Sequence, residues 1–223
     1  MPDVHRVTRL HFVNAFLVEE DDGLTLVDTT LGGGAGAIRA AAEQLGRPIV
    51  RIALTHAHGD HIGSLDALHA ELPDTEVLIS GRDARLLKKD LGRLESEPPE
   101  AKIRGSLPGA TTAPTRLLAA GDRIGSLEVV PSPGHTPGHV SFLDTRDRTL
   151  YCGDAYTTLG VVATSAKGTW RFPLAAMVTW HPPTALESAK ALRALDPARL
   201  APGHGKVVES PGPAMDAAIA RGI

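Results

Sequence analysis

A run of metal-binding residue types at positions 55–61, THAHGDH, constrains the fold of this chain more than any other feature. It holds three histidines and one aspartate and directly follows the apolar residues 49–54. Imidazole and carboxylate groups are ligands that zinc and similar divalent ions prefer. Because residues two apart in an extended segment point the same way, His56, His58 and Asp60 are expected to converge on one spot. His61 would face another spot, so one turn after a strand could supply two adjacent ions.

Two common zinc motifs do not match this run. The metalloprotease helix H-E-x-x-H spaces its two histidines four residues apart, which is not the pattern here. A structural zinc finger needs paired thiolates, and Cys152 is the only cysteine. A solvating loop is the plain alternative, but ten histidines in 223 residues make a chance H-x-H-x-D-H pattern rare.

Composition narrows the class of protein. Hydrophobic residues form 42% of the chain, enough for a packed core, yet no segment approaches the ~20 apolar residues that span a bilayer. The net charge of −3, without long runs of one sign, argues against nucleic acid as the main partner. Residues 1–6 do not lead into an apolar stretch of the signal-peptide kind. We therefore expect a cytoplasmic enzyme with a small-molecule substrate and no membrane or nucleic-acid partner, and leave a homodimer open.

Apolar periodicity predicts strands and helices in two similar halves. In the first half we expect strands at 12–19, 24–29, 49–54 and 76–80, and helices at 35–45 and 62–72. In the second half we expect strands at 127–131, 140–144, 149–152 and 200–202, and helices at 184–195 and 213–220. Each half holds strands followed by a helix, so residues 1–223 are predicted to form a single α/β domain of two face-to-face sheets with helices outside.

Residues 83–114 break this pattern. They start helical at 84–89 and then turn polar and proline-rich, with no periodicity at 95–100. We expect an insertion or lid over the site, with an uninvolved surface loop as the alternative.

Three further ligand-type residues follow predicted strands of the second half, each beside a glycine. His135 lies in the loop GHTPGH at 134–139, Asp154 follows Gly153, and His204 lies between two glycines. Glycine allows the backbone to turn sharply or to approach closely at such positions. These residues are therefore candidates to complete a metal site with the histidine run.

Taken in order, these motifs resemble those of the metallo-β-lactamase superfamily of hydrolases. The resemblance extends from the strand around Asn14 to His204 and includes Asp28, which closes an early strand. It implies a four-layer αββα sandwich with two mixed sheets and with the site at one edge of the sheets.

The resemblance also implies how the ligands are shared between two metal ions. One ion would be bound by His56, His58 and His135, the other by Asp60, His61 and His204, with Asp154 bridging the two. Zinc is the expected metal, with iron or manganese as alternatives. Paired ions ~3.5–4 Å apart lower the pKa of bound water and polarise a carbonyl or phosphoryl oxygen. A metal-bridging hydroxide would then be the nucleophile, held and oriented by Asp60, which could also take its proton.

Two other residues are expected to support the ligands. The pattern of the family uses His135 rather than His139 as the ligand, so His139 would position a neighbour and could donate to a ligand carboxylate. Asp28 would orient the histidine loop, with a plain cap at the strand end as the alternative.

Differences between this sequence and the patterns of individual branches of the family indicate which reaction to expect. β-Lactamases of one type have a cysteine at the position of Asp154. Cys152 lies two residues before that position, so we expect it to be a buried core residue. Glyoxalase II enzymes carry a C-terminal helical part that the 19 residues after His204 do not supply. Lactonases have a tyrosine just after the bridging aspartate. Tyr156 is close to that position, and we expect it to be catalytic, donating a hydrogen bond to the substrate carbonyl, unless it is a packed aromatic.

These features predict a dinuclear-metal hydrolase that cleaves a carbonyl ester, thioester or lactone, with a lactonase-like reaction favoured. The alternatives are a phosphodiesterase or nuclease of the same fold, β-lactam hydrolysis as a minor activity, and a metal-binding scaffold without activity. The aromatic segment 170–180 is expected either to line an acyl pocket or to belong to the core.

Overall fold

The computed structural model describes residues 4–222, which form two sheets packed face to face. The first sheet has the strand order β1-β2-β3-β4-β5-β6. The first three strands are antiparallel and the remaining neighbours are parallel. Its members are β1 (His5–Arg9), β2 (Val13–Glu20), β3 (Gly23–Val27), β4 (Ile49–Ala53), β5 (Glu76–Ser80) and β6 (Arg116–Leu118).

The second sheet has the order β14-β13-β10-β9-β8-β7, in which only β10 and β13 run parallel. A separate two-stranded sheet lies between β10 and α5 in the sequence, formed by β11 (Tyr156–Thr157) and β12 (Ala163–Thr164). The strands of the second sheet are β7 (Arg123–Ile124), β8 (Leu127–Pro131), β9 (Val140–Asp144), β10 (Thr149–Gly153), β13 (Arg199–Pro202) and β14 (Val208–Glu209).

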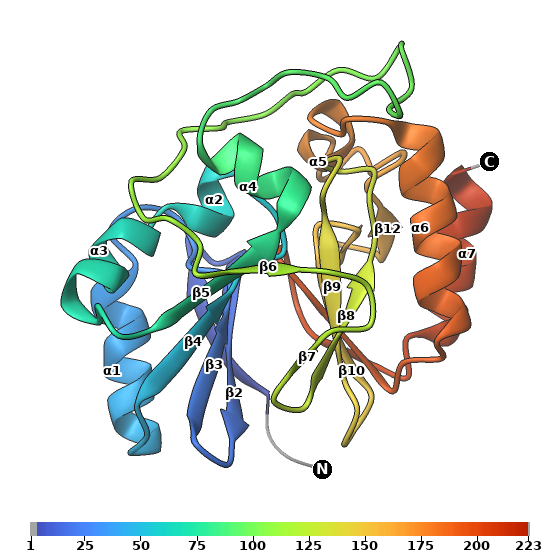
Figure 1. The fold of residues 1–223 in the computed structure, drawn as a ribbon. Helices are drawn as coiled ribbons and strands as arrows, with labels where there is room; N and C mark the ends of the chain where they lie inside the picture. Colours follow the sequence, from blue (N-terminus) through green and yellow to red (C-terminus); the bar gives the residue numbers. More distant parts are fainter. Residues whose placement is uncertain (1–3, 223) are drawn as a thin grey trace.

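Helices cover the outer face of each sheet (Figure 1). On the first sheet lie α1 and α3, and on the second lie α6 and α7, so the order of layers is helix, sheet, sheet, helix. The described helices are α1 (Ala35–Leu45), α2 (Gly59–Ile62), α3 (Leu65–Glu71), α4 (Gly81–Leu87), α5 (Leu174–Met177), α6 (Pro182–Ala194) and α7 (Gly212–Gly222). This arrangement confirms the predicted αββα sandwich. Within residues 4–222, none of these helices is long and apolar enough to cross a membrane.

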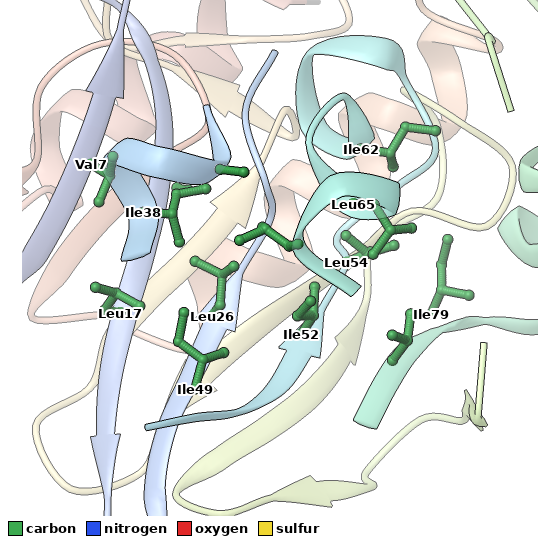
Figure 2. Close-up of a cluster of buried hydrophobic side chains, with 14 of the residues drawn as sticks. Val7, Leu17, Leu26, Ile38, Ile49, Ile52, Leu54, Ile62, Leu65 and Ile79 are labelled. Carbon is green, nitrogen blue, oxygen red and sulfur yellow. The ribbon is translucent and has the colours of Figure 1, made fainter. Parts of the chain in front are cut away.

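Alternation along the strands explains why the two sheets pack this way. In β2, Ala15 and Leu17 belong to the apolar cluster beneath α1 and α3, whereas Phe16 and Val18 belong to the cluster between the sheets. Successive side chains of a strand point to opposite faces, so a strand that is apolar throughout is buried on both faces. Figure 2 shows Ile38 and Leu65 from the helices above Leu26 and Ile52 of the first sheet.

Most predicted elements are confirmed within a residue or two, and three strands and helix α1 have the predicted bounds. Helix α1 ends as expected at Gly46, which adopts the left-handed conformation with φ +66°. The predicted helix 62–72 is wrong as a single helix. Helix α2 begins inside the histidine run, and α3 starts only at Leu65. The break lies at Gly63, whose amide donates to the Thr30 carbonyl instead of continuing a helix.

Residues 88–115, called here the strap, hold neither helix nor strand and cross the top of Figure 1 from α4 towards α5. The strap is nevertheless anchored. Its Ile103 and Leu107 pack against the apolar cluster of the first sheet. The Lys102 amide donates to the Trp180 carbonyl, and the Ser106 carbonyl accepts from the Gly59 amide. The strap therefore lies against the histidine run, although the sequence gives no periodic sign of it.

Candidate metal centre

All seven expected ligands meet where strands of both sheets end. His56 and His58 follow β4, and Asp60 and His61 lie in α2. The other three, His135, Asp154 and His204, follow β8, β10 and β13 respectively. Strand ends at a common edge thus supply ligands from both halves of the chain, as is usual for sites in α/β folds.

Their ligand atoms form three overlapping groups, in each of which the atoms lie within 4.8 Å of one another. The groups are His56 with His58 and His135, His56 with His61 and Asp154, and Asp60 with His61 and His204. The first and third groups are the two ligand sets that the family resemblance implied. The middle group connects them through Asp154, which also lies 3.2 Å from the Nε2 atom of His204 and 3.3 Å from that of His135.

The polar atoms at the centre fit divalent ions. His56 Nε2 and Asp154 Oδ1 are buried and have no hydrogen-bond partner in the described part of the chain. His58 Nδ1 and His135 Nε2 lie 3.0 Å apart, so two ring nitrogens converge on the same space. Buried polar atoms are normally hydrogen-bonded, and orphaned imidazole and carboxylate atoms in one place are the donor set of a metal site. These residues therefore suit two divalent ions that share Asp154.

Several histidines of this set are fixed through their other ring nitrogen. His61 Nδ1 lies 2.8 Å from a carboxylate oxygen of Asp28, which also accepts from the Thr55 hydroxyl and, through its other oxygen, from the Thr55 amide. Asp28 therefore orients the histidine loop, as expected. His135 Nδ1 lies 3.2 Å from the Thr179 hydroxyl. Such partners fix the tautomer and the orientation of metal-binding imidazoles.

The strap performs the same role for His58. Its Arg104 carbonyl lies 2.9 Å from His58 Nε2, which leaves Nδ1 to face the centre. Gly105 has φ +86°, and a Cβ atom there would lie 2.6 Å from His58 Nε2. Only glycine allows the strap to approach the ring this closely. The predicted insertion is thus in contact with a candidate ligand.

His139 is a positioning residue and is in none of the three ligand groups. Its Nε2 atom accepts from the Asp154 amide at 3.1 Å, and its Nδ1 atom lies 2.8 Å from the Ser132 hydroxyl. Burial lowers the pKa of His139 to about 3, so the ring stays neutral and can accept that hydrogen bond. The sequence predicted a donor to a ligand carboxylate; the structure instead shows an acceptor of the ligand's backbone N–H.

Asp83 also supports the centre, and sequence reasoning missed it. Its buried carboxylate accepts hydrogen bonds from the Ala57 amide, the Thr136 hydroxyl and the Gly138 amide, at 2.7–2.9 Å. It therefore connects the loop of His56 and His58 with the loop of His135. The only signal in the sequence was its position three residues after Ser80, whose hydroxyl caps helix α4.

Charge divides the metal-free ligands into two kinds. Burial and the neighbouring histidines hold the pKa of His56 well below its usual range, and burial does the same for His135. Burial also lowers the pKa of His204, but the Asp154 carboxylate outweighs it and raises that pKa to about 9. Asp154 itself has a pKa well below its usual range because His204 and His61 outweigh the effect of burial. Burial lowers the pKa of His61 as well, but the carboxylates of Asp154 and Asp28 outweigh it and hold that pKa well above its usual range, so metal binding would displace protons from His61 and His204.

The structure corrects two expectations. Asp60 was expected to point the same way as His56 and His58, but the chain is helical from Gly59 onward, so Asp60 groups with His61 and His204. Tyr156 was expected to donate to substrate. Its hydroxyl instead donates to the Ala189 carbonyl of α6 at 2.7 Å, and its ring is fully buried in the cluster beneath α6 and α7. Tyr156 is therefore a packed aromatic turned away from the centre.

Cys152 belongs to the core, and the aromatic segment 170–180 is divided between the cavity, the core and the surface. Cys152 is fully buried in the same cluster as Tyr156, and burial raises the pKa of its thiol. In the segment 170–180, Phe172 lines the cavity over the candidate ligands, Trp170 is 85% exposed and Trp180 is buried. Only part of that segment therefore reaches the centre.

A cavity of about 640 Å³ opens directly over the ligands. His58, Asp60, His135, Asp154 and His204 form its polar floor. Its walls come from the segment 10–13, the loop at 31–32, the strap and α5. A small organic molecule could therefore reach ions bound at this centre.

Comparison with known proteins agrees with this geometry. The uncharacterized protein YobT of Bacillus subtilis (strain 168) is 47% identical over 208 residues, covering 93% of this chain and 89% of that protein. A hydroxyacylglutathione hydrolase of Stenotrophomonas maltophilia (strain R551-3) is 29% identical over 148 residues, covering 65% of this chain and 46% of that enzyme. The crystal structure of TTHA1623 in a di-iron-bound form matches with a TM-score of 0.68 and 28% identity, over 95% of this chain and 96% of that one.

Further relatives are named as probable metallo-hydrolases, and members of the matched family are mostly metal-dependent hydrolases. The family model of the metallo-beta-lactamase superfamily matches residues 8–204, which include the whole candidate centre. With the sandwich fold and the histidine and aspartate groups in place, this match shows that the chain belongs to the metallo-beta-lactamase superfamily.

Proposed function

We propose that this protein is a dinuclear-metal hydrolase that cleaves a carbonyl ester, a thioester or a lactone. One observation carries the proposal. Two ligand groups, each able to hold an ion, are joined through Asp154 at the floor of an open cavity. A closed structural site would have no such opening, whereas a catalytic site keeps positions for water and substrate.

The residues of this chain would hold and orient the reacting groups. Two divalent ions bound here would lower the pKa of a bound water and polarise the substrate oxygen. Asp60 is half-buried and faces the cavity. Burial raises its pKa, but the hydrogen bond with His204 outweighs burial and holds the pKa below the usual range. Its ionised carboxylate can therefore accept a hydrogen bond from a water molecule beside the ligands and orient it.

The family relatives guide the choice of substrate only in part. Hydroxyacylglutathione hydrolase is the name of a thioesterase, which supports cleavage of an acyl compound by this fold. The present chain spans 46% of that enzyme. We therefore propose cleavage of an acyl compound and assign no particular thiol or alcohol as the leaving group.

A substrate panel tests the proposal. The purified protein, loaded with zinc or in parallel with iron, would be assayed with a homoserine lactone, a glutathione thioester, a nitrocefin-type lactam and bis-p-nitrophenyl phosphate. Turnover of the lactone or thioester that disappears with a chelator is the expected result. Turnover of the phosphodiester alone would overturn the acyl substrate class and leave the metal site standing. No turnover by protein that binds two ions would overturn the proposed activity.

A further inference from the structure

Away from the candidate ligands, the cavity over the metal centre is lined mainly by apolar side chains and glycines. On one side its wall is formed by Leu10, Phe12, Phe172 and Leu174. Phe12 and Phe172 pack edge to face with ring centroids 6.1 Å apart, and both lie beside the ring of His204, at 5.9 and 5.2 Å. The aromatic pair therefore begins at a candidate ligand, and the aliphatic side chains continue the wall outward.

The same wall extends to the surface of the molecule. Leu10 is 61% exposed and Leu174 is 56% exposed, although both line the cavity. Large apolar side chains at the mouth of a pocket are exposed to water unless a ligand covers them. Their burial would stabilise a bound aliphatic chain that runs from the ligands towards the mouth.

The charged groups of the cavity are all acidic or belong to the centre. Among its described lining residues, no lysine or arginine occurs. Asp66 also lines the cavity, and its carboxylate accepts from the amides of Thr111 and Thr112 at 3.0 and 2.8 Å. Away from the ions, an anionic group of a substrate would therefore meet a carboxylate and apolar surface rather than a cation.

Resting on the proposed hydrolase function, we propose that this cavity selects substrates whose reacting carbonyl carries an uncharged aliphatic chain. Leu174 is assigned as a specificity-determining residue that contacts this chain. Substrates with a carboxylate at the far end of the chain are rejected because the wall offers that carboxylate no partner.

Helix α5 offers a matched pair of positions for testing this. Leu174 lines the cavity over the centre. Met177 lies on the same helix and is 63% exposed, but lines a neighbouring cavity with Glu100, Lys102 and Trp180. Because both side chains are largely exposed, lysine at either position should leave folding intact. Leu174→Lys places a cation at the mouth of the cavity, and Met177→Lys places the same cation outside it.

The first measurement compares two esters that differ only in the end of the chain. Zinc-loaded protein would be assayed with p-nitrophenyl hexanoate and with mono-p-nitrophenyl adipate. We expect kcat/KM to favour the hexanoate by roughly tenfold, less than the full cost of an unpaired polar group in apolar surroundings because the mouth of the cavity is partly open to water. Leu174→Lys should reduce this ratio by roughly threefold to fivefold, and Met177→Lys should leave it unchanged. Equal kcat/KM for the two esters, or equal ratios in both variants, would overturn the proposal.

A binding measurement separates this inference from the hydrolase function. Hexanamide and adipamate have the same amide head and differ in the same terminal carboxylate. Saturation-transfer NMR should show hexanamide bound roughly tenfold more tightly by the wild-type protein, with a smaller preference in Leu174→Lys. If this holds and neither ester is cleaved, the proposed function fails and the selectivity stands. If the esters are cleaved and the two amides bind equally, the selectivity fails alone.

Discussion

The two sheets contribute to the metal centre in different ways. The first sheet supplies four candidate ligands from one segment of six residues after β4. The second sheet supplies three candidate ligands from three separate loops, after β8, β10 and β13. The ligands of the first half are therefore set by local chain geometry. Those of the second half depend on the register of three strands and on contacts between distant segments.

The residues that hold the ligands in place therefore differ between the two halves. In the first half, Asp28 holds both Thr55 and His61 and so fixes both ends of the run. In the second half, each of two ligand loops has its own partner, His139 for Asp154 and Thr179 for His135. A defect in the first half should thus affect several ligands together, and a defect in the second half should affect one.

Substitution of Asp154, the candidate ligand that connects the two groups, should have the largest effect. Asp154→Asn removes the carboxylate that connects the two ligand groups, so we expect both ions to bind more weakly and the hydrolytic rate to fall about 1,000-fold or more. Metal content by mass spectrometry and kcat/KM would measure it. Glu20→Gln is the matched control, since Glu20 is also a buried carboxylate but bonds Ser126, away from the site. Full metal content in Asp154→Asn would contradict the bridging role.

Substitution of a ligand that belongs to one group only should remove one ion and leave the other bound. His204→Ala removes a member of the group with Asp60 and His61, and should leave the group of His56, His58 and His135 able to hold one ion. His58→Ala should do the reverse. Anomalous scattering from crystals of each variant would locate the remaining ion. Loss of both ions in either variant would show that the two positions do not fill independently.

The positioning residues test the contrast between the halves more finely. Asp28→Asn keeps a residue that tolerates the left-handed conformation found there, with φ +59°, but removes the charge facing His61. His139→Ala removes the acceptor of the Asp154 amide. Each should weaken metal binding by roughly 10- to 100-fold, as measured by chelator competition.

These two variants should weaken the binding of both ions, but through different residues. Asp28→Asn acts on the histidine run as a whole and should weaken both ions. His139→Ala acts through one ligand, yet that ligand is shared, so an effect on both ions there points to Asp154 as the common cause. An Asp28→Asn protein with unchanged affinity for both ions would show that the run holds its shape without this carboxylate.

The contrast also explains what the sequence could and could not predict. The histidine run lies within six residues, so its chemistry is visible without knowledge of the fold. Helix α1 and strands β5, β8 and β9 have the predicted bounds, because apolar periodicity and glycine at the helix end are local signals. The remaining ligands were assigned by family resemblance, since no local pattern brings His135, Asp154 and His204 together.

What the sequence missed depends on contacts between distant segments. The carboxylate of Asp83 binds backbone groups 26 and 55 residues away, so its role becomes visible only after folding. The expectation for Tyr156, carried over from the lactonase pattern, also failed. Gly153 has φ +47°, and the pairing of β10 with β13 shifts register beside it. The alternation of side chains is interrupted there, and Tyr156 faces α6.

Asp83 connects the two halves and should have a moderate effect that depends on pH. Asp83→Asn places an amide donor against groups that themselves donate, and should lower the free energy of unfolding by ~1–3 kcal/mol. Burial raises the pKa of Asp83 to about 6, although hydrogen bonds from Thr136, Ala57 and Gly138 oppose this. Because the folded pKa exceeds that of the unfolded chain, the stability from Asp83 is present below about pH 4 and is lost as the pH rises through about 6.

Urea unfolding of the metal-free wild-type and variant proteins would measure this dependence. The difference in free energy of unfolding should be larger at about pH 4.5 than at about pH 7.5. A difference that grows with pH would mean that the folded protein favours the ionised carboxylate. In that case the three hydrogen bonds to Asp83 outweigh its burial.

Tyr156→Phe should have the smallest effect. It tests whether Tyr156 stabilises the fold of the second half without taking part in the reaction. The variant loses the hydrogen bond to the Ala189 carbonyl inside the cluster beneath α6 and α7, so the free energy of unfolding should fall by ~1 kcal/mol. The hydroxyl faces away from the ligands, so kcat and KM should stay within about twofold of the wild-type values. Urea unfolding and steady-state kinetics on the same preparation would give both numbers. A large fall in kcat with unchanged stability would mean that Tyr156 contacts the substrate after all.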